Sequence, residues 1–227
     1  MLAPEKTKEG ILTPMNIMSN EFRQAKSINY GKFLPAGQTT QMIVGASPES
    51  DGQIVRLTQS LYKKYSLKRV YYSSYIPAND KNPNLPVKPV GLLREHRLYQ
   101  ADWLLRFYGF SASEILDEDE NLAEEYDPKC GWALKHPEFF PVEINSAPPE
   151  TLVRVPGIGF KSAYKIVSAR RYHSLYFSDL EKMRVVMKRA KHFITCNGKF
   201  FGIDDDIKIK GLLAIESKNE FATQLSL

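Results

Sequence analysis

The chain has 227 residues, of which 43% are hydrophobic and 25% are charged, and its formal net charge is +5. A chain of this length can bury a sizeable core in one or two domains. It has no apolar run of the roughly 18 residues that a membrane span needs, and its first residues lack the apolar region of a signal peptide. We therefore expect a cytoplasmic protein with no membrane partner.

Only two cysteines occur, Cys130 and Cys196, and they lie far apart in the sequence. Zinc sites and disulfide frameworks require cysteines at short, recurring spacings. We therefore expect two reduced thiols and no metal site.

Residues 1–36 show no strong hydrophobic period and contain three prolines, so we predict only a short helix there, at 17–25. The segment supplies hardly any strand that could pair with the strands predicted after it. An unpaired sheet edge exposes backbone N–H and C=O groups, which tend to pair with another strand. We therefore expect the sheet to be incomplete on its N-terminal side.

The next segment predicts a parallel β-α-β unit. Residues 40–46 and 69–76 are compact runs rich in strand-forming residues. Between them, apolar residues recur at helical spacing after Ser50 or Asp51, either of which could cap the helix. Strand, helix and strand in such short succession predict a right-handed crossover between parallel strands.

A long amphipathic helix is predicted at 92–107, ending before Gly109. Its polar residues Arg94, Glu95, His96, Arg97 and Gln100 could line a site. Such a run is also typical of an ion-paired helix surface, and the sequence leaves both interpretations open.

Charge is segregated along the chain. Residues 111–150 hold eleven acids and two lysines, a net charge of −9, whereas residues 151–200 hold eleven lysines and arginines and two acids, a net charge of +9. A concentrated basic surface is what neutralisation of nucleic-acid phosphates requires. The acids at 117–127 are more typical of a solvated loop or helix face than of a metal site.

Within the basic segment, residues 152–167 predict two short helices joined by a tight turn, Pro156-Gly157-Ile158-Gly159. Glycines adopt positive φ readily and carry no Cβ, so a phosphate could approach the amides at the start of the second helix. The alternative is a helical hairpin in which the glycines serve only to turn the chain.

This stretch resembles the helix-hairpin-helix motif of DNA repair and recombination proteins, and its lead-in at 144–152 resembles that of competence DNA receptors. The resemblance implies that the turn holds a backbone phosphate of double-stranded DNA without reading bases. The residues it assigns to DNA binding are Val155, Pro156, Gly157, Ile158, Gly159, Lys161, Ser162 and Lys165. Residues 179–190 have the outline of a second copy without glycine in the turn, so we expect it to pair with the first and to add the charges of Lys188 and Arg189.

A second resemblance covers residues 33–199 and is to the C-terminal half of DNA modification and repair radical SAM proteins. The matching stretches are residues 33–46, 69–73 and 92–110, together with the hairpin. The resemblance implies a partial (β/α) barrel, with S-adenosylmethionine bound near Gly45 and Glu49. Helix capping and turn formation explain Glu49 and Asp51 equally well.

Members of that family carry a CxxxCxxC motif for an iron-sulfur cluster, and this chain contains no such triplet. A cluster with one open iron needs three thiolates. We therefore expect no cofactor and no radical SAM activity in this chain alone, although the full-length family implies both an iron-sulfur cluster and S-adenosylmethionine.

The predicted fold class is α/β plus all-α. We predict a partial β/α barrel fragment at 1–110, an acidic helical connector at 111–141, a paired helix-hairpin-helix domain at 142–200 and a tail at 201–227. The expected function is non-sequence-specific DNA binding in DNA repair or modification. The alternatives are one half of a split radical SAM enzyme, completed by an N-terminal partner chain with the cysteine triplet, and an inactive remnant that binds proteins.

Overall fold

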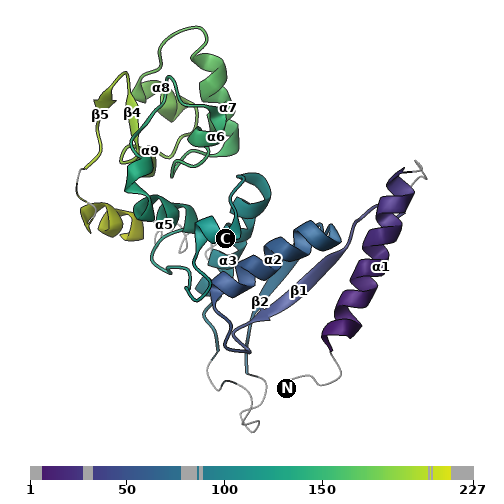
Figure 1. The fold of residues 1–227 in the computed structure, drawn as a ribbon. Coiled ribbons are helices and arrows are strands. Elements are labelled where there is room, and N and C mark those ends of the chain that lie inside the picture. Colours follow the sequence, from purple (N-terminus) through teal and green to yellow (C-terminus); the bar gives the residue numbers. More distant parts are fainter. Residues whose placement is uncertain are drawn as a thin grey trace. The chain divides into compact units, whose positions relative to one another are not determined.

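The computed structural model describes residues 7–27, 33–77, 86, 89–203, 205 and 207–215. Within them the protein is a mixed α/β structure (Figure 1). It divides into two compact units, each described by itself below. The first unit is Met1–Asp102 with Asp117–Asn121, and the second is Trp103–Leu116 with Leu122–Leu227. The end of the predicted tail, 216–227, lies outside the described residues.

The first unit contains two parallel strands joined by a helix. β1 (Thr39–Val44) and β2 (Arg69–Ser74) pair with Thr39 opposite Arg69, and α2 (Asp51–Tyr65) connects them. This confirms the predicted β-α-β unit. In the described part of the chain the sheet has these two strands and closes no barrel.

Helices cover one face of this sheet. Tyr72 is buried on that face, where its hydroxyl shares a 2.9 Å hydrogen bond with Thr58 of α2. Its ring also meets the ring of Tyr99, from α3 (Leu92–Phe107), edge-on with centroids 5.2 Å apart. Residues on the opposite face include Ile43, which is 60% exposed. The sheet is therefore packed on one side.

The start of α2 is covered by the segment Asp117–Asn121. Ser50 closes a capping box, as one of the two predicted caps, and the Gly52 amide donates to the Glu120 carbonyl at 2.9 Å. A Cβ on Gly52 would lie 2.0 Å from the Asp117 carbonyl oxygen, so glycine is required for this approach. Most of the acidic side chains stay exposed, as predicted, while the backbone docks where the helix dipole favours negative charge.

The prediction for the N-terminal helix was wrong in extent. α1 (Lys8–Ser27) is longer than the helix predicted at 17–25 and contains Pro14. An interior proline removes a backbone hydrogen bond and costs about 3 kcal/mol. Burial of Met15, and the 3.3 Å hydrogen bond that its carbonyl accepts from Gln38, are tertiary contacts that counter this cost.

The second unit consists mainly of short helices. They are the end of α3, α4 (Ala112–Ile115), α5 (Pro128–Lys135), the 3-10 helix η1 (Pro137–Phe139), α6 (Pro149–Leu152), α7 (Phe160–Ala169), α8 (Phe177–Lys182), α9 (Met187–Ala190) and a helical stretch at 207–215. The two helix pairs predicted around the glycine turn and around residues 179–190 are both present, as α6 with α7 and α8 with α9.

A small sheet corrects the prediction that this part is all-α. β3 (Val142–Glu143) runs parallel to β4 (Ile194–Cys196), which is antiparallel to β5 (Lys199–Phe200). Strands of two or three residues are too short for the alternation of side chains that reveals a strand in a sequence.

Candidate nucleic-acid interface

The turn between α6 and α7, residues 153–159, is anchored in the core of the second unit. Val155 and Ile158 are buried, and the Ile158 amide donates to the Val155 carbonyl at 3.1 Å. Pro156 is buried as well. These three residues, predicted to bind DNA, shape the turn from inside, and their side chains do not reach the surface.

Gly157 lies against the second helix pair. It has φ +82°, and an added Cβ would lie 2.5 Å from the Val186 carbonyl oxygen and 3.0 Å from the Ala190 amide nitrogen. The Gly157 carbonyl accepts a 2.9 Å hydrogen bond from the Val186 amide. Close packing of the chain on itself therefore explains this glycine without any ligand.

Gly159 has a different environment. It is the N-cap of α7 with φ −87°, and an added Cβ would meet only the Tyr108 hydroxyl, at 3.6 Å. As the N-cap, Gly159 has no side chain that could accept a hydrogen bond from the first turn of α7. Amides at a helix start favour an anion because they lack partners within the helix and carry the positive end of its dipole.

Two lysines follow this helix start. Lys161 and Lys165 are one turn apart on α7, and both are exposed. Ser162 lies between them but is buried, with its hydroxyl donating to the carbonyls of Met183 and Arg184 at 3.1 and 3.3 Å. Of these predicted site residues, the lysines are placed to meet a ligand, and the serine joins α7 to the turn after α8.

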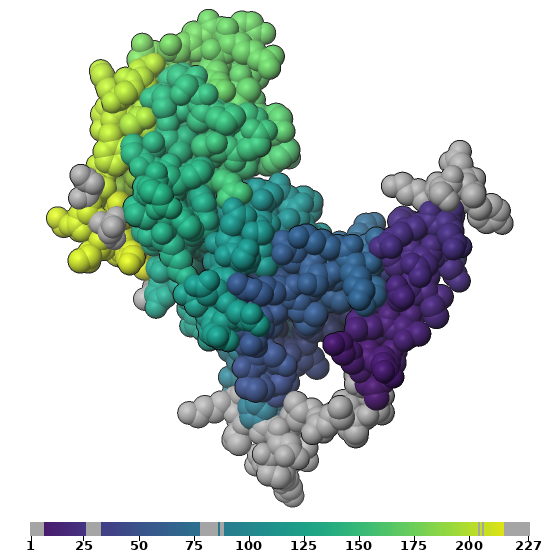
Figure 2. Space-filling model, in the orientation of Figure 1, coloured from purple at the N-terminus to yellow at the C-terminus, as the bar shows by residue number. Residues whose placement is uncertain are grey.

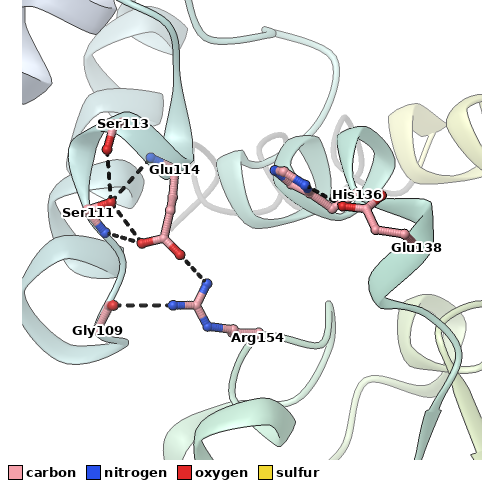
Figure 3. Close-up of polar contacts among 7 residues, drawn as sticks. All are labelled: Gly109, Ser111, Ser113, Glu114, His136, Glu138 and Arg154. Atoms are coloured by element: carbon pink, nitrogen blue, oxygen red, sulfur yellow. Dashed lines mark hydrogen bonds and ion pairs between the residues drawn. The ribbon is translucent and has the colours of Figure 1, made fainter.

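Arg154, within the turn, is engaged by its own unit (Figure 3). Its guanidinium donates to Glu114 at 2.8 Å and to the Gly109 carbonyl at 3.4 Å, and it lies over the rings of Phe110 and Trp132. Partial burial alone would raise the pKa of Glu114, but hydrogen bonds from Ser111 and Arg154 lower it. The carboxylate therefore stays charged and fixes the arginine.

Arg170 and Arg189 are also held by contacts within the second unit. Arg170 donates to the carbonyls of Ile144 and Ala147 at 2.9 and 2.6 Å. Arg189, predicted to contact DNA, is 13% exposed in its side chain and pairs with Asp127 at 3.0 Å. Acids of the 111–141 segment thus neutralise part of the basic segment.

Of the other eight bases between residues 151 and 200, seven are exposed, and six of these lie in the segment 160–191, which is green in Figure 2. The exposed lysines and arginines between 151 and 200 are Lys161, Lys165, Arg171, Lys182, Arg184, Lys188 and Lys199. Lys188 is therefore available from the predicted second copy, whereas its neighbour Arg189 is not.

Lys129, in α5, contacts the glycine turn, which its place in the sequence does not predict. Its ammonium donates to the Ile158 carbonyl at 2.6 Å and lies 4.8 Å from the centre of the Tyr108 ring. Burial lowers the pKa of Lys129 to about 7, and the charge of Asp127 opposes this. No local pattern connects a lysine of the acidic segment with a turn 29 residues later.

In the first unit, Gly45 and Glu49 line a pocket of about 880 Å³ at the C-terminal end of β1. Gly45 has φ +82°, and an added Cβ would lie 2.0 Å from a Val90 methyl group. Arg94 lines the same pocket, donating to the Asp51 carboxylate at 2.7 Å and to the Glu49 carbonyl at 3.0 Å.

The other polar residues predicted to line a site on α3 have structural partners. The Glu95 carboxylate accepts the Ser74 amide at 2.7 Å, at the end of β2. Arg97 is 3% exposed and donates to Gln100 at 2.9 Å, and Gln100 also contacts His96. These four side chains are therefore held by hydrogen bonds, and Arg94 is the member of the predicted set that lines the pocket.

Neither cysteine resembles a cluster ligand. The Cys130 thiol donates to Asp127 at 3.2 Å and the Cys196 thiol to the Leu175 carbonyl at 2.8 Å. Burial raises the pKa of Cys130 well above its usual range and that of Cys196 to about 11. Over the described ranges, no three His, Cys, Asp or Glu side chains gather as a metal site would require.

Comparison of the chain with models of protein families, with curated proteins and with solved structures gave no match. The two resemblances seen in the sequence therefore stay predictions. Within the described residues, no helix has both the length and the apolar character to cross a membrane.

Alanine substitutions at Gly157 and Gly159 should change the stability of the protein by different amounts. Gly157→Ala should lower the free energy of unfolding by about 2–4 kcal/mol, through positive φ and overpacking against Val186. Gly159→Ala should cost less than about 1 kcal/mol, since its φ suits alanine and its space is open. Urea denaturation followed by circular dichroism measures both, and equal losses would contradict the packing described for Gly157.

Because the pKa of Lys129 is lowered in the folded protein, we expect its contribution to stability to depend on pH. Between pH about 7, its folded pKa, and about 10.4, its unfolded pKa, the unfolded chain binds a proton that the folded chain lacks. The free energy of unfolding of the wild type, minus that of Lys129→Met, should therefore rise with pH across this window. Lys135→Met, an exposed change in the same helix, is the control. A flat difference in urea denaturation would show that the lysine is not desolvated.

Proposed function

We propose that the second unit binds double-stranded DNA through its phosphate backbone, without sequence preference. The observation that carries this proposal is the start of α7, where Gly159 leaves the first amides without a side-chain acceptor and Lys161 and Lys165 are exposed beside them. One phosphate at the helix start and two lysines along the backbone would position a duplex but read no base.

We also propose that α6 with α7 and α8 with α9 are two paired helix-hairpin-helix units. The hydrogen bond between Gly157 and Val186 supports the pairing, because it joins the two turns directly. In this interpretation the first copy provides the amides, and the second provides Lys188 as a charge.

The division between engaged and exposed bases also supports the proposal. Arg154, Arg170 and Arg189 are held by their own unit, so a ligand would meet mostly lysines. Lysine is a compact charge without the planar fork that pairs with a guanine edge. A surface on which five of the seven exposed bases are lysines is therefore better suited to phosphates than to base recognition.

Salt titration tests this function. Affinity for unrelated duplexes should be similar and should fall as salt rises, with a slope of about −0.9 for each phosphate contact. K161Q/K165Q should flatten the slope by up to about 2, because two contacts are lost. Fluorescence anisotropy measures both quantities.

The matched control is K63Q/K64Q, which removes two exposed charges from α2 in the first unit. It should leave both slope and affinity nearly unchanged. Equal effects of the two double variants would mean that total charge, rather than the start of α7, holds the DNA. A strong preference for one duplex would contradict the proposed mode of binding.

A second candidate function is the C-terminal half of a split radical SAM enzyme. It is supported by the parallel β1–β2 pair, and by the pocket at the C-terminal end of β1 that Gly45 and Glu49 line. Open α/β sheets bind ligands at this end of their strands. The thiols of this chain do not fit a cluster, so another chain would have to supply the cysteine triplet.

This candidate predicts that the purified chain, after anaerobic reconstitution with iron and sulfide, holds no stoichiometric cluster. Both thiols are buried and hydrogen-bonded, and a cluster requires three thiolates. Iron and sulfide assays with visible absorbance measure this. A stoichiometric cluster would contradict the description of the cysteines, whereas cleavage of S-adenosylmethionine only after mixing with a triplet-bearing chain would favour the split enzyme.

A further inference from the structure

An aromatic groove lies beside the start of α7, within the second unit. We use this name for the pocket of about 450 Å³ that is lined by Trp103, Phe107, Tyr108, Gly159, Phe160, Lys161 and Ser162. Its volume falls within the roughly 300–1,000 Å³ of small-ligand sites. Trp103, Phe107 and Phe160 are 52%, 46% and 49% exposed, which is unusual for large apolar side chains that lie together.

The aromatic rings form two pairs on two helices. Trp103 and Phe107 are one turn apart on α3, with ring centroids 4.4 Å apart and a tilt of 53°. Phe160 and Tyr164 repeat this spacing on α7, with centroids 4.7 Å apart and a tilt of 47°. Rings fixed on helices lose little conformational freedom when a flat partner stacks on them.

Basic side chains lie in and beside the groove. Lys161 is the one charged side chain among the described residues that line it. The Arg106 guanidinium lies 4.6 Å from the centre of the Phe107 ring, and the exposed Lys165 is one turn beyond Lys161. The same lining includes Gly159 and Phe160, where the first turn of α7 has no side-chain cap. A flat apolar ring that carries an anion would match these features.

We propose that the aromatic groove takes one unpaired nucleotide of a DNA strand, with its base against Trp103 or Phe160 and its phosphate at the start of α7. This inference rests on the proposed DNA binding and narrows its substrate. Bases within an intact duplex are stacked on one another and cannot enter, whereas an extruded or single-stranded base can. The preferred substrate is therefore a duplex that contains an unpaired base.

The experiment compares a fully paired duplex with the same duplex carrying one extra, unpaired thymine. Stacking of one base is worth roughly five- to 150-fold in affinity, so we expect the second duplex to bind at least about fivefold more tightly. It should also quench tryptophan emission, because Trp103 is half exposed while Trp132, the other tryptophan, is buried. Anisotropy and fluorescence quenching give two separate readouts.

Trp103→Leu and Phe160→Leu test the groove separately, so that one variant remains if the other does not fold by circular dichroism. Each should lose the preference for the unpaired base and keep the affinity for the paired duplex. Tyr172→Leu is the matched control, since Tyr172 is 85% exposed and is not among the groove residues. It should keep the preference.

The outcomes separate the two proposals. Binding of both duplexes with equal affinity, and no quenching, would overturn the groove proposal and leave DNA binding intact. Absence of binding to either duplex at low salt would overturn the proposed function and this inference with it. If the leucine variants changed only the oligomeric state of the chain, the groove would be a protein interface, and the nucleotide proposal would be wrong.

Discussion

The second unit depends on one contact between backbone segments that are distant in sequence. The Gly157 carbonyl accepts the Val186 amide, and no Cβ fits between residue 157 and the start of α9. This contact fixes the turn against the second helix pair, with Ile158 in the core and Lys129 bound to its carbonyl. The direction in which the first amides of α7 point follows from how this turn is held.

Three of the five arginines in residues 151–200 are held within the second unit, whereas five of the six lysines are exposed. Arg154, Arg170 and Arg189 each make contacts inside the unit, with carboxylates or with several carbonyls. A planar guanidinium with five donors is weakly hydrated and suits such positions, whereas an ammonium group is strongly hydrated and favours the surface. The net charge of the segment therefore overstates the charge that a ligand could meet, and a count of bases cannot reveal this.

The sequence was most informative where the structure is governed by local patterns. The β1–α2–β2 unit and the two helix pairs follow from apolar spacing, Ser50 and the glycine turn. Contacts made across long separations were not predictable. The strands β3 and β4 are short and pair residues some fifty positions apart, α1 continues through Pro14 because of tertiary contacts, and the partners of Arg189 and Lys129 lie in other segments. Gly157 and Gly159 look equivalent in sequence, yet only the first is required for packing.

The residues of the two units alternate along the chain. The chain leaves the first unit after Asp102, returns at Asp117–Asn121 to cover the start of α2, and leaves again at Leu122. Neither unit is therefore a continuous stretch of sequence. A fragment that ended near residue 110 would lack the backbone of Asp117–Asn121 that covers the start of α2, and one that began there would lack the end of α3. No single cut of the chain therefore yields either unit with all of its residues.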